Sequence, residues 1–236
     1  MTVWGICEKG DYREDNQDSI LMRNEGNSGI FLVADGVGGS LDGAGASGYI
    51  AQRYGAWWEY VFQAHRAKDF FSLFGHIKDT AEQINEELCR DSGAGNSCST
   101  LALLFVHQGI CGYLSCGDSR IYRCGREGAR VITRDDVWEN RPDRDAGSEH
   151  AGMIISAVGG YENLEYSCAT DKVRAGEVFL LCSDGIYRYV EEDELLAGLR
   201  HMYRMPFLRQ GRVEKLARRA VEHDTKDNYS LIAVKV

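Results

Sequence analysis

Apolar residues alternate with polar ones, or form short unbroken runs, over most of the chain, and glycine-rich turns separate these segments. Segments of this length and pattern predict β-strands. The predicted strands are residues 3–7, 18–22, 30–34, 99–106, 110–116, 119–124, 129–133, 153–158, 164–170, 177–182 and 229–236. Because many of the connecting turns are short, we expect the strands to pair in antiparallel sheets.

Helical periodicity is confined to a few places. Apolar residues recur every three to four positions in 43–65 and 70–90, and again in 191–200 and 207–223. Paired helices that interrupt a series of strands favour an α+β fold, in which antiparallel sheets cover each other and carry the helices outside. Residues 134–152 are polar and predict a surface loop or flap.

Charge narrows the possible functions. The 236 residues include 27 Lys and Arg against 36 Asp and Glu, which gives a net charge of −9. This balance disfavours binding to nucleic acid and to anionic membranes. No apolar run approaches the about 18–20 residues of a membrane span, and the first residues lack the pattern of a signal peptide, so we expect a cytoplasmic protein. No linker-like tract divides the chain, and we expect one domain over 1–236.

Cysteine and histidine offer little support for a soft-metal site. The eight cysteines form no CxxC motif and mostly lie in apolar segments, which is typical of reduced, buried thiols. The six histidines form neither an HExxH nor an HxH motif, so a zinc site is disfavoured. His150 lies in the flap and stays open as a residue that assists catalysis.

Several aspartates lie where a predicted strand ends. Asp35 follows the run FLVA, Asp184 follows FLLCS, and a glycine comes directly after each. In a hairpin that turns near residues 26 and 27, Asp18 would lie opposite Asp35, at about 4.5–5.5 Å between paired residues. Asp227 precedes the last strand and Asp118 lies between two strands, so both could reach the same edge. The alternative for Asp35, Asp118, Asp184 and Asp227 is a plain turn residue, a frequent use of Asp beside Gly.

Carboxylates held this close together repel each other unless a cation lies between them or one of them is protonated. Oxygen ligands, with help from the backbone carbonyl of Gly36, suit Mg²⁺ or Mn²⁺. Two such ions can acidify a water molecule and stabilise displacement at phosphorus, so the cluster predicts hydrolysis of a phosphate ester. Arg13 is the candidate for gripping the phosphate, because a guanidinium pairs with its oxygens in a bidentate manner; a surface ion pair is the alternative.

Taken in order, eight segments resemble the motifs of the metal-dependent PPM protein phosphatases, the type 2C serine/threonine family, in its compact bacterial form. They are REDNQDS (13–19), ADGVGG (34–39), GNSCSTLALLFV (95–106), CGDSRIYR (116–123), ITRDD (132–136), SAVGG (156–160), LLCSDGIY (180–187) and DNYSLIAVKV (227–236). The segments span nearly the whole chain. The resemblance implies two central antiparallel β-sheets packed as a sandwich and flanked by pairs of α-helices, a four-layer αββα arrangement.

The resemblance also implies roles for individual residues. Asp35 would bridge two Mn²⁺ or Mg²⁺ ions, and Gly36 would add its carbonyl oxygen. Asp184 and Asp227 would hold the first ion, and Arg13 would bind phosphate. These residues are therefore the expected centre of the site.

The second and third metal positions depart from the family pattern or depend on further residues. Gln17 replaces an acidic residue, so the second ion would be held by Gln17 through water, by Asp18, or by solvent alone. Asp18 could instead orient a metal-bound water. Asp118 matches a carboxylate that can hold a possible third ion, together with the flap near 134–156. Some eukaryotic members have a histidine after DG as a candidate general acid. Val37 takes its place here, and bacterial members also lack that histidine.

The flap itself departs from the pattern. Asp136 stands where the T-x-D-H motif has histidine, and Ile155 and Ser156 replace Thr-Arg before the AVGG turn. We therefore expect an atypical flap and an atypical substrate preference.

The leading hypothesis is a metal-dependent protein serine/threonine phosphatase, which hydrolyses phosphoserine and phosphothreonine esters by attack of a metal-bridged water. Its partners would be a phosphorylated protein substrate and a cognate serine/threonine kinase that it opposes, and we expect a monomer. One alternative is a catalytically silent module of the same fold that binds a phosphoprotein or regulator. Another is a phosphatase of small phosphoesters. Retention of Arg13, Asp35, Asp184 and Asp227 favours the enzyme, whereas Gln17 and the altered flap favour the silent module.

Overall fold

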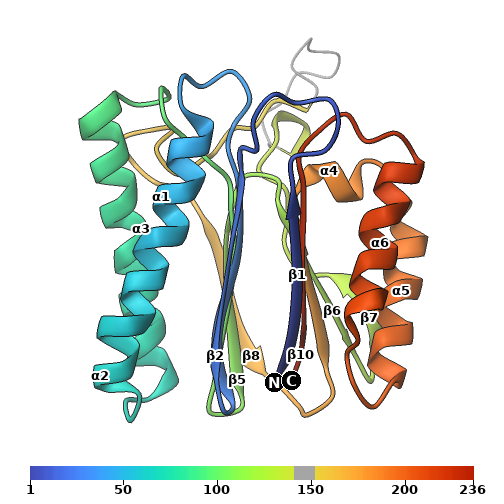
Figure 1. Ribbon diagram of the computed structural model, residues 1–236. Helices are drawn as coiled ribbons and strands as arrows, with labels where there is room; N and C mark the ends of the chain where they lie inside the picture. Colours follow the sequence, from blue (N-terminus) through green and yellow to red (C-terminus); the bar gives the residue numbers. More distant parts are fainter. Residues whose placement is uncertain (141–151) are drawn as a thin grey trace.

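Residues 1–140 and 152–236, which the computed structural model describes, form ten strands in two antiparallel sheets of five strands each (Figure 1). The first sheet has the spatial order β1 (Thr2–Glu8), β10 (Tyr229–Lys235), β9 (Val178–Cys182), β6 (Arg120–Gly125) and β7 (Gly128–Val131). The second has the order β2 (Asp18–Glu25), β3 (Ser28–Asp35), β4 (Leu101–His107), β5 (Ile110–Cys116) and β8 (Ser167–Lys172).

Helices cover the outer face of each sheet (Figure 1). The second sheet carries α1 (Gly43–Ala56), a π-helical turn (Trp57–Phe62), α2 (Gln63–His65) and α3 (Phe70–Ser92). The first sheet carries α4 (Asp184–Tyr187), α5 (Glu192–Arg204) and α6 (Gln210–Glu222), and a short 3₁₀ turn (Trp138–Asn140) lies in the loop after β7. The predicted α+β sandwich with four layers is confirmed.

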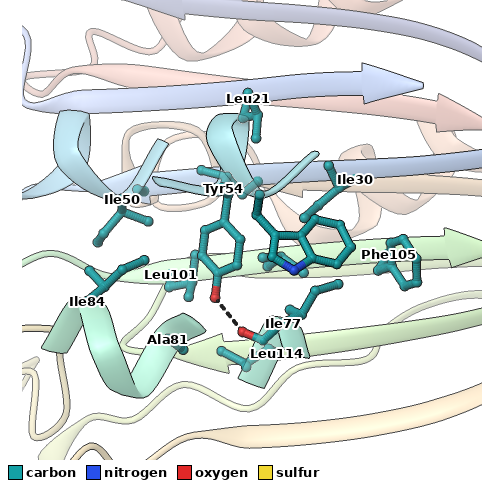
Figure 2. Packing of buried hydrophobic residues seen from close by; sticks show 14 of the residues in the cluster. Leu21, Ile30, Ile50, Tyr54, Ile77, Ala81, Ile84, Leu101, Phe105 and Leu114 are labelled. Atoms are coloured by element: carbon teal, nitrogen blue, oxygen red, sulfur yellow. Dashed lines mark hydrogen bonds between the residues drawn. The ribbon is translucent and has the colours of Figure 1, made fainter. Parts of the chain in front are cut away.

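The alternation of side chains along each strand creates a separate core between each pair of layers. On β3, Ile30 and Leu32 point toward α1 and α3, whereas Phe31 and Val33 point toward the other sheet. Figure 2 shows the helix-facing core, in which the buried Tyr54 hydroxyl donates to the Ile77 carbonyl at 3.0 Å. Both sheets are thus packed on both faces, and the ends of their strands can position polar groups.

The strand and helix predictions are largely confirmed, with one clear error. Residues 153–158 form no strand; Ile154 and Val158 each make only a single bridge, to Val137 and Ser99. The chain makes a sharp turn directly after this segment, at Gly159, which has a φ of 84°. The turn requires glycine because a Cβ there would lie 2.2 Å from the Ser97 carbonyl oxygen. The last turns of the first predicted helix also widen into the π-helical turn.

Part of the predicted flap, residues 141–151, lies outside the described residues, and so does His150. All eight cysteines are free thiols, and five of them are buried, which confirms the prediction of reduced, mostly buried cysteines. In the described part of the chain no helix is both long and apolar enough to cross a bilayer.

Candidate active site

The first pair of aspartates is set by a hairpin. Asp18 begins β2 and Asp35 ends β3, and the two residues pair directly across the strands. The turn lies at Gly26 and Asn27, and Gly26 supplies a positive φ of 57°. The predicted register is therefore confirmed, and it places both carboxylates at the end of the hairpin away from its turn.

The second pair comes from the other sheet. Asp184 follows β9 and Asp227 precedes β10, and these neighbouring strands are antiparallel, with Ser183 N–H donating to the Ser230 carbonyl at 3.0 Å. Gly185 lies against the backbone between them, since a Cβ there would be 1.9 Å from the Asn228 carbonyl oxygen. Because Gly185 has no side chain, the start of α4 can lie directly beside the backbone of Asn228, the residue that follows Asp227.

A hydroxyl group connects the two pairs across the sandwich. Ser183 Oγ donates to Asp18 Oδ2 at 2.8 Å and accepts from the Ser230 N–H at 3.0 Å. Asp18 is 5% exposed, and its other carboxylate oxygen is buried with no hydrogen-bond partner. The aspartates of the two sheets therefore lie together at one end of the β-sandwich, which we call the rim.

Burial and mutual repulsion shift the titration of these groups. Burial raises the pKa of Asp18 to about 6, although the hydroxyls of Ser230 and Ser183 partly offset it. Burial, and then the charge of Asp118, raises the pKa of Asp184 to about 6. The pKa of Asp35 is raised well above its usual value by burial and by the neighbouring carboxylates, with Asp18 the strongest of them. Full ionisation of the cluster is therefore unfavourable without a compensating cation.

The backbone of Asp35 is held by the two residues that precede β4. Its N–H donates to Thr100 Oγ1 at 3.0 Å, and its carbonyl accepts from Thr100 N–H at 2.8 Å and from Ser99 Oγ at 2.9 Å. Gly36 packs against the first residue of α1, where a Cβ would lie 2.5 Å from the backbone of Gly43. These contacts hold the main chain and leave the Asp35 carboxylate free to face its neighbours.

Arg13 reaches the same rim from the loop after β1. Its guanidinium donates twice to Asp227, at 2.8 Å to Oδ1 and 2.6 Å to Oδ2. The hydrogen bonds with Asp227 raise the pKa of Arg13, and the charges of Asp184 and Asp35 add to the effect. The side chains are 48% and 30% exposed, so this pair contributes only about 0–1 kcal/mol and can open readily.

Asp118 lies in the turn between β5 and β6 and is 2% exposed. Its Oδ2 accepts from the Tyr187 hydroxyl and from Arg188 Nη2, both at 2.9 Å. It is close enough to raise the pKa of Asp35 and Asp184. The structure thus brings together the aspartates that the sequence predicts as metal ligands, which are Asp18, Asp35, Asp118, Asp184 and Asp227.

Comparison with known proteins agrees with this geometry. No protein-family model matches the sequence. A protein of Mycoplasma pneumoniae, described as a candidate protein phosphatase, is 26% identical over 246 aligned positions, which cover 96% of this chain and 92% of the relative. The solved structure of PppA, described as a key regulatory component of T6SS in Pseudomonas aeruginosa, matches with a TM-score of 0.80 and 26% identity over 100% of this chain and 97% of that one.

A third match includes metal ions. The catalytic domain of the serine/threonine protein phosphatase PstP, in complex with two manganese ions, matches with a TM-score of 0.77 and 21% identity over 99% of this chain and 97% of that one. Further relatives are named serine/threonine phosphatases. The predicted relationship to the PPM-type protein phosphatases is confirmed.

The residues of this site fit a hard divalent cation. The candidate ligands are carboxylate and backbone carbonyl oxygens, which Mg²⁺ and Mn²⁺ prefer. In addition, Oδ1 of Asp18 is buried without a hydrogen-bond donor, so a cation could satisfy it. Among the described residues no three His, Cys, Asp or Glu side chains are already arranged as metal ligands. Two of the candidate carboxylates are instead paired with arginine, Asp227 with Arg13 and Asp118 with Arg188. Ligation by the predicted residues stays a prediction.

Gln17 occupies the position where the PPM pattern has an acidic residue. Its backbone N–H donates to Asn228 Oδ1 at 2.9 Å, and its carbonyl accepts from Gly36 N–H at 3.0 Å and from Ser47 Oγ at 2.6 Å. The backbone of Gln17 therefore supports the neighbouring ligand candidates Asp18 and Gly36 whatever its side chain does.

Some residues that support the site were not predicted from the sequence. Asn228 is 3% exposed, and its amide also donates to the carbonyls of Lys9 and Asp15, so it ties the Arg13 loop to β10. Ser183 and Arg188 were likewise not assigned a role. A signal existed for Ser183, which is a polar residue directly between a buried strand and a candidate ligand.

Proposed function

We propose that this chain is a metal-dependent protein serine/threonine phosphatase that hydrolyses phosphoserine and phosphothreonine esters. The observation that carries the proposal is the pairing of Asp18 with Asp35 beside Asp184, three carboxylates from two sheets with raised pKa values at one rim. Relatives named serine/threonine phosphatases support the substrate class. The manganese ions of the PstP catalytic domain support the choice of metal.

Two Mn²⁺ or Mg²⁺ ions, when bound, would supply Lewis acidity that activates the attacking water and neutralises charge on the phosphate. Asp18, Asp35, Asp184 and the carbonyl of Gly36 would hold them, joined by Asp227 once it leaves Arg13. The Asp35 backbone clamp keeps the central carboxylate in place without using its oxygens.

Arg13 binds and orients the phosphoryl group in this proposal. A guanidinium that exchanges the Asp227 carboxylate for two phosphate oxygens keeps its bidentate geometry and its charge pairing. The exchange costs little because the pair is exposed. Substrate binding would therefore release Asp227 toward the metal.

The partners belong to the proposal as well. The chain would act on phosphorylated proteins and oppose a serine/threonine kinase, as a monomer in the cytoplasm. The net charge of −9 agrees with a protein substrate rather than a nucleic acid.

Hydrolysis of a phosphothreonine peptide, measured with Mn²⁺, with Mg²⁺ and with chelator, tests the proposal. We expect metal-dependent turnover that falls at least about 100-fold in Asp35→Asn and in Asp184→Asn, because each change removes a charged ligand. Asp79→Asn, an exposed position on α3, is the control for loss of one negative charge and should retain full activity.

A folded wild-type protein with no turnover on phosphopeptides would overturn the phosphatase proposal. If it nevertheless binds the phosphopeptide, the silent binding module is the better description. Turnover of nucleotide or sugar phosphates alone would instead indicate a phosphatase of small phosphoesters.

A further inference from the structure

Arg188 connects two aspartates of the site and has no role in the function described so far. Its Nη2 donates to Asp118 Oδ2 at 2.9 Å, and its Nε lies 3.2 Å from Asp184 Oδ2. One guanidinium therefore pairs with carboxylates from two different turns of the rim.

The fold places the half-exposed Arg188 side chain beside both carboxylates. Arg188 directly follows α4, and its backbone N–H donates to the Asp184 carbonyl at 3.0 Å, so its side chain lies on the same side of the helix as Asp184. Next to it, Tyr187 donates its hydroxyl to Asp118, and the ring of Tyr187 lies 3.7 Å from the guanidinium carbon of Arg120. Arg120 is itself held by a bidentate pair with Asp135.

Asp118 is the carboxylate that the PPM resemblance assigns to a third cation, and its surroundings here do not fit one. The side chain is 2% exposed, and Oδ2 already accepts two hydrogen bonds, one of them from a cation. A metal ion bound through this oxygen would have to displace the guanidinium from a buried carboxylate. The two ion pairs differ in their carboxylates, because the Asp227 side chain is 30% exposed and the Asp118 side chain 2%, whereas both arginine side chains are 48% exposed. Opening the Arg188–Asp118 pair would therefore leave a buried charge, and opening the Arg13–Asp227 pair would not.

We propose that Arg188 takes the place of a third divalent cation in this chain, so that the site holds two ions and a fixed guanidinium. The inference rests on the proposed function for the identity of the first two ions. It assigns Arg188 as a positioning residue that neutralises Asp118 and restrains Asp184.

The number of Mn²⁺ ions bound per chain at saturation, measured by equilibrium dialysis, tests this proposal without reference to activity. We expect two ions in the wild type and two in Asp118→Asn, because Asp118 is not a ligand while Arg188 is present. Arg188→Met should bind three, since the uncovered carboxylate then needs a cation, and Arg188→Met combined with Asp118→Asn should return to two.

Two further variants separate position from charge. Arg188→Lys keeps a positive charge beside Asp118 and should stay at two ions. Arg218→Met removes one positive charge from an exposed position on α6, far along the chain from Asp118, and should also stay at two.

A third ion in the wild type that Asp118→Asn removes would overturn the proposal, and this comparison holds even if Arg188→Met fails to fold. A folded Arg188→Met that still binds two ions would also overturn it. Failure of the proposed function looks different, because the wild type would then bind no ions or would bind two and hydrolyse no phosphopeptide.

Discussion

Single charged residues in this molecule differ mainly in how far water can reach them. Asp227 is partly open to solvent in its pair with Arg13, whereas Asp118 is buried in its pair with Arg188. The same distinction applies outside the site, at Asp136 near the base of the flap. Its Oδ2 accepts from Gly117 N–H at 3.2 Å, and burial, with repulsion from Asp135 and Glu165, raises its pKa to about 6.

Asp136→Asn should therefore stabilise the protein in a pH-dependent way. A carboxyl whose pKa is raised in the folded state is destabilising above that pKa, and the cost disappears as the pH falls through about 6 toward the unfolded value of 3.8. Asparagine can still accept the Gly117 hydrogen bond and carries no charge. We expect a gain of about 1–2 kcal/mol in the free energy of unfolding at pH 8, shrinking toward zero near pH 4.

Urea unfolding of the metal-free protein at several pH values measures this difference. Asp79→Asn, on the exposed face of α3, controls for loss of charge and should match the wild type at each pH. A difference that does not change with pH would contradict the assignment of the effect to the buried charge.

At the residue scale, the sequence predicted contacts between residues that are close together in the chain. Asp18 and Asp35 belong to one hairpin whose turn is marked by glycine, so their pairing follows from counting along two strands. The contact of Arg13 with Asp227 joins residues 214 positions apart. No periodicity encodes such a contact, and the coverage of Asp118 by Arg188 was missed for the same reason.

The stability of a helix depends on whether the backbone groups at its ends find hydrogen-bond partners. The C-terminal end of α5 has carbonyl groups that no turn of the helix can satisfy. Lys235, at the end of β10 and 8% exposed, donates its ammonium group to the carbonyls of Met202, Tyr203 and Met205 at 2.9, 3.0 and 2.7 Å. The last residues of the chain thus hold α5 onto the first sheet.

Lys235→Met should lower the free energy of unfolding by about 2–4 kcal/mol, because it removes charged hydrogen bonds and leaves buried carbonyls without a donor. Chemical denaturation of the variant measures the loss. Lys215→Met, on the exposed side of α6, removes the same charge and should change stability by no more than about 0.5 kcal/mol. Equal losses in the two variants would argue against the capping role.

At the element scale the apolar pattern predicted the strands, including the edge strands β1 and β8. Residues 153–158 look like a strand because they are apolar, yet their pairing partners allow only single bridges. The π-helical turn at Trp57–Phe62 was not predicted from the sequence either. It buries three aromatic side chains, Trp57, Trp58 and Phe62, against the core. Tertiary packing decides both cases.

The whole molecule encloses its thiols unevenly. Cys168 on the edge strand β8 is exposed, whereas Cys111 and Cys116 on β5 are buried, and burial raises their pKa values to about 11 and about 12. Thiolate, the reactive form, is therefore scarce at the buried positions.

Alkylation of the folded protein at pH 8, followed by mass spectrometry, should label Cys168 first and leave Cys111 and Cys116 unmodified until denaturant is added. The reason is both access and thiolate content. Cys168→Ser should abolish the fast phase. Labelling of Cys116 as quickly as Cys168 in the folded state would contradict the four-layer packing described above.

The pairing of β1 with β10 has a consequence for the newborn chain. The two strands lie side by side with the chain ends together (Figure 1), yet roughly 200 residues separate β1 from the strand that completes it. At about 5–20 residues per second, a ribosome needs roughly 10–40 s to supply β10 after β1 has emerged. During that interval the β2–β5 sheet can already assemble, while β1 waits with open backbone groups, and nascent chains on one messenger are most exposed to mutual strand exchange at this point.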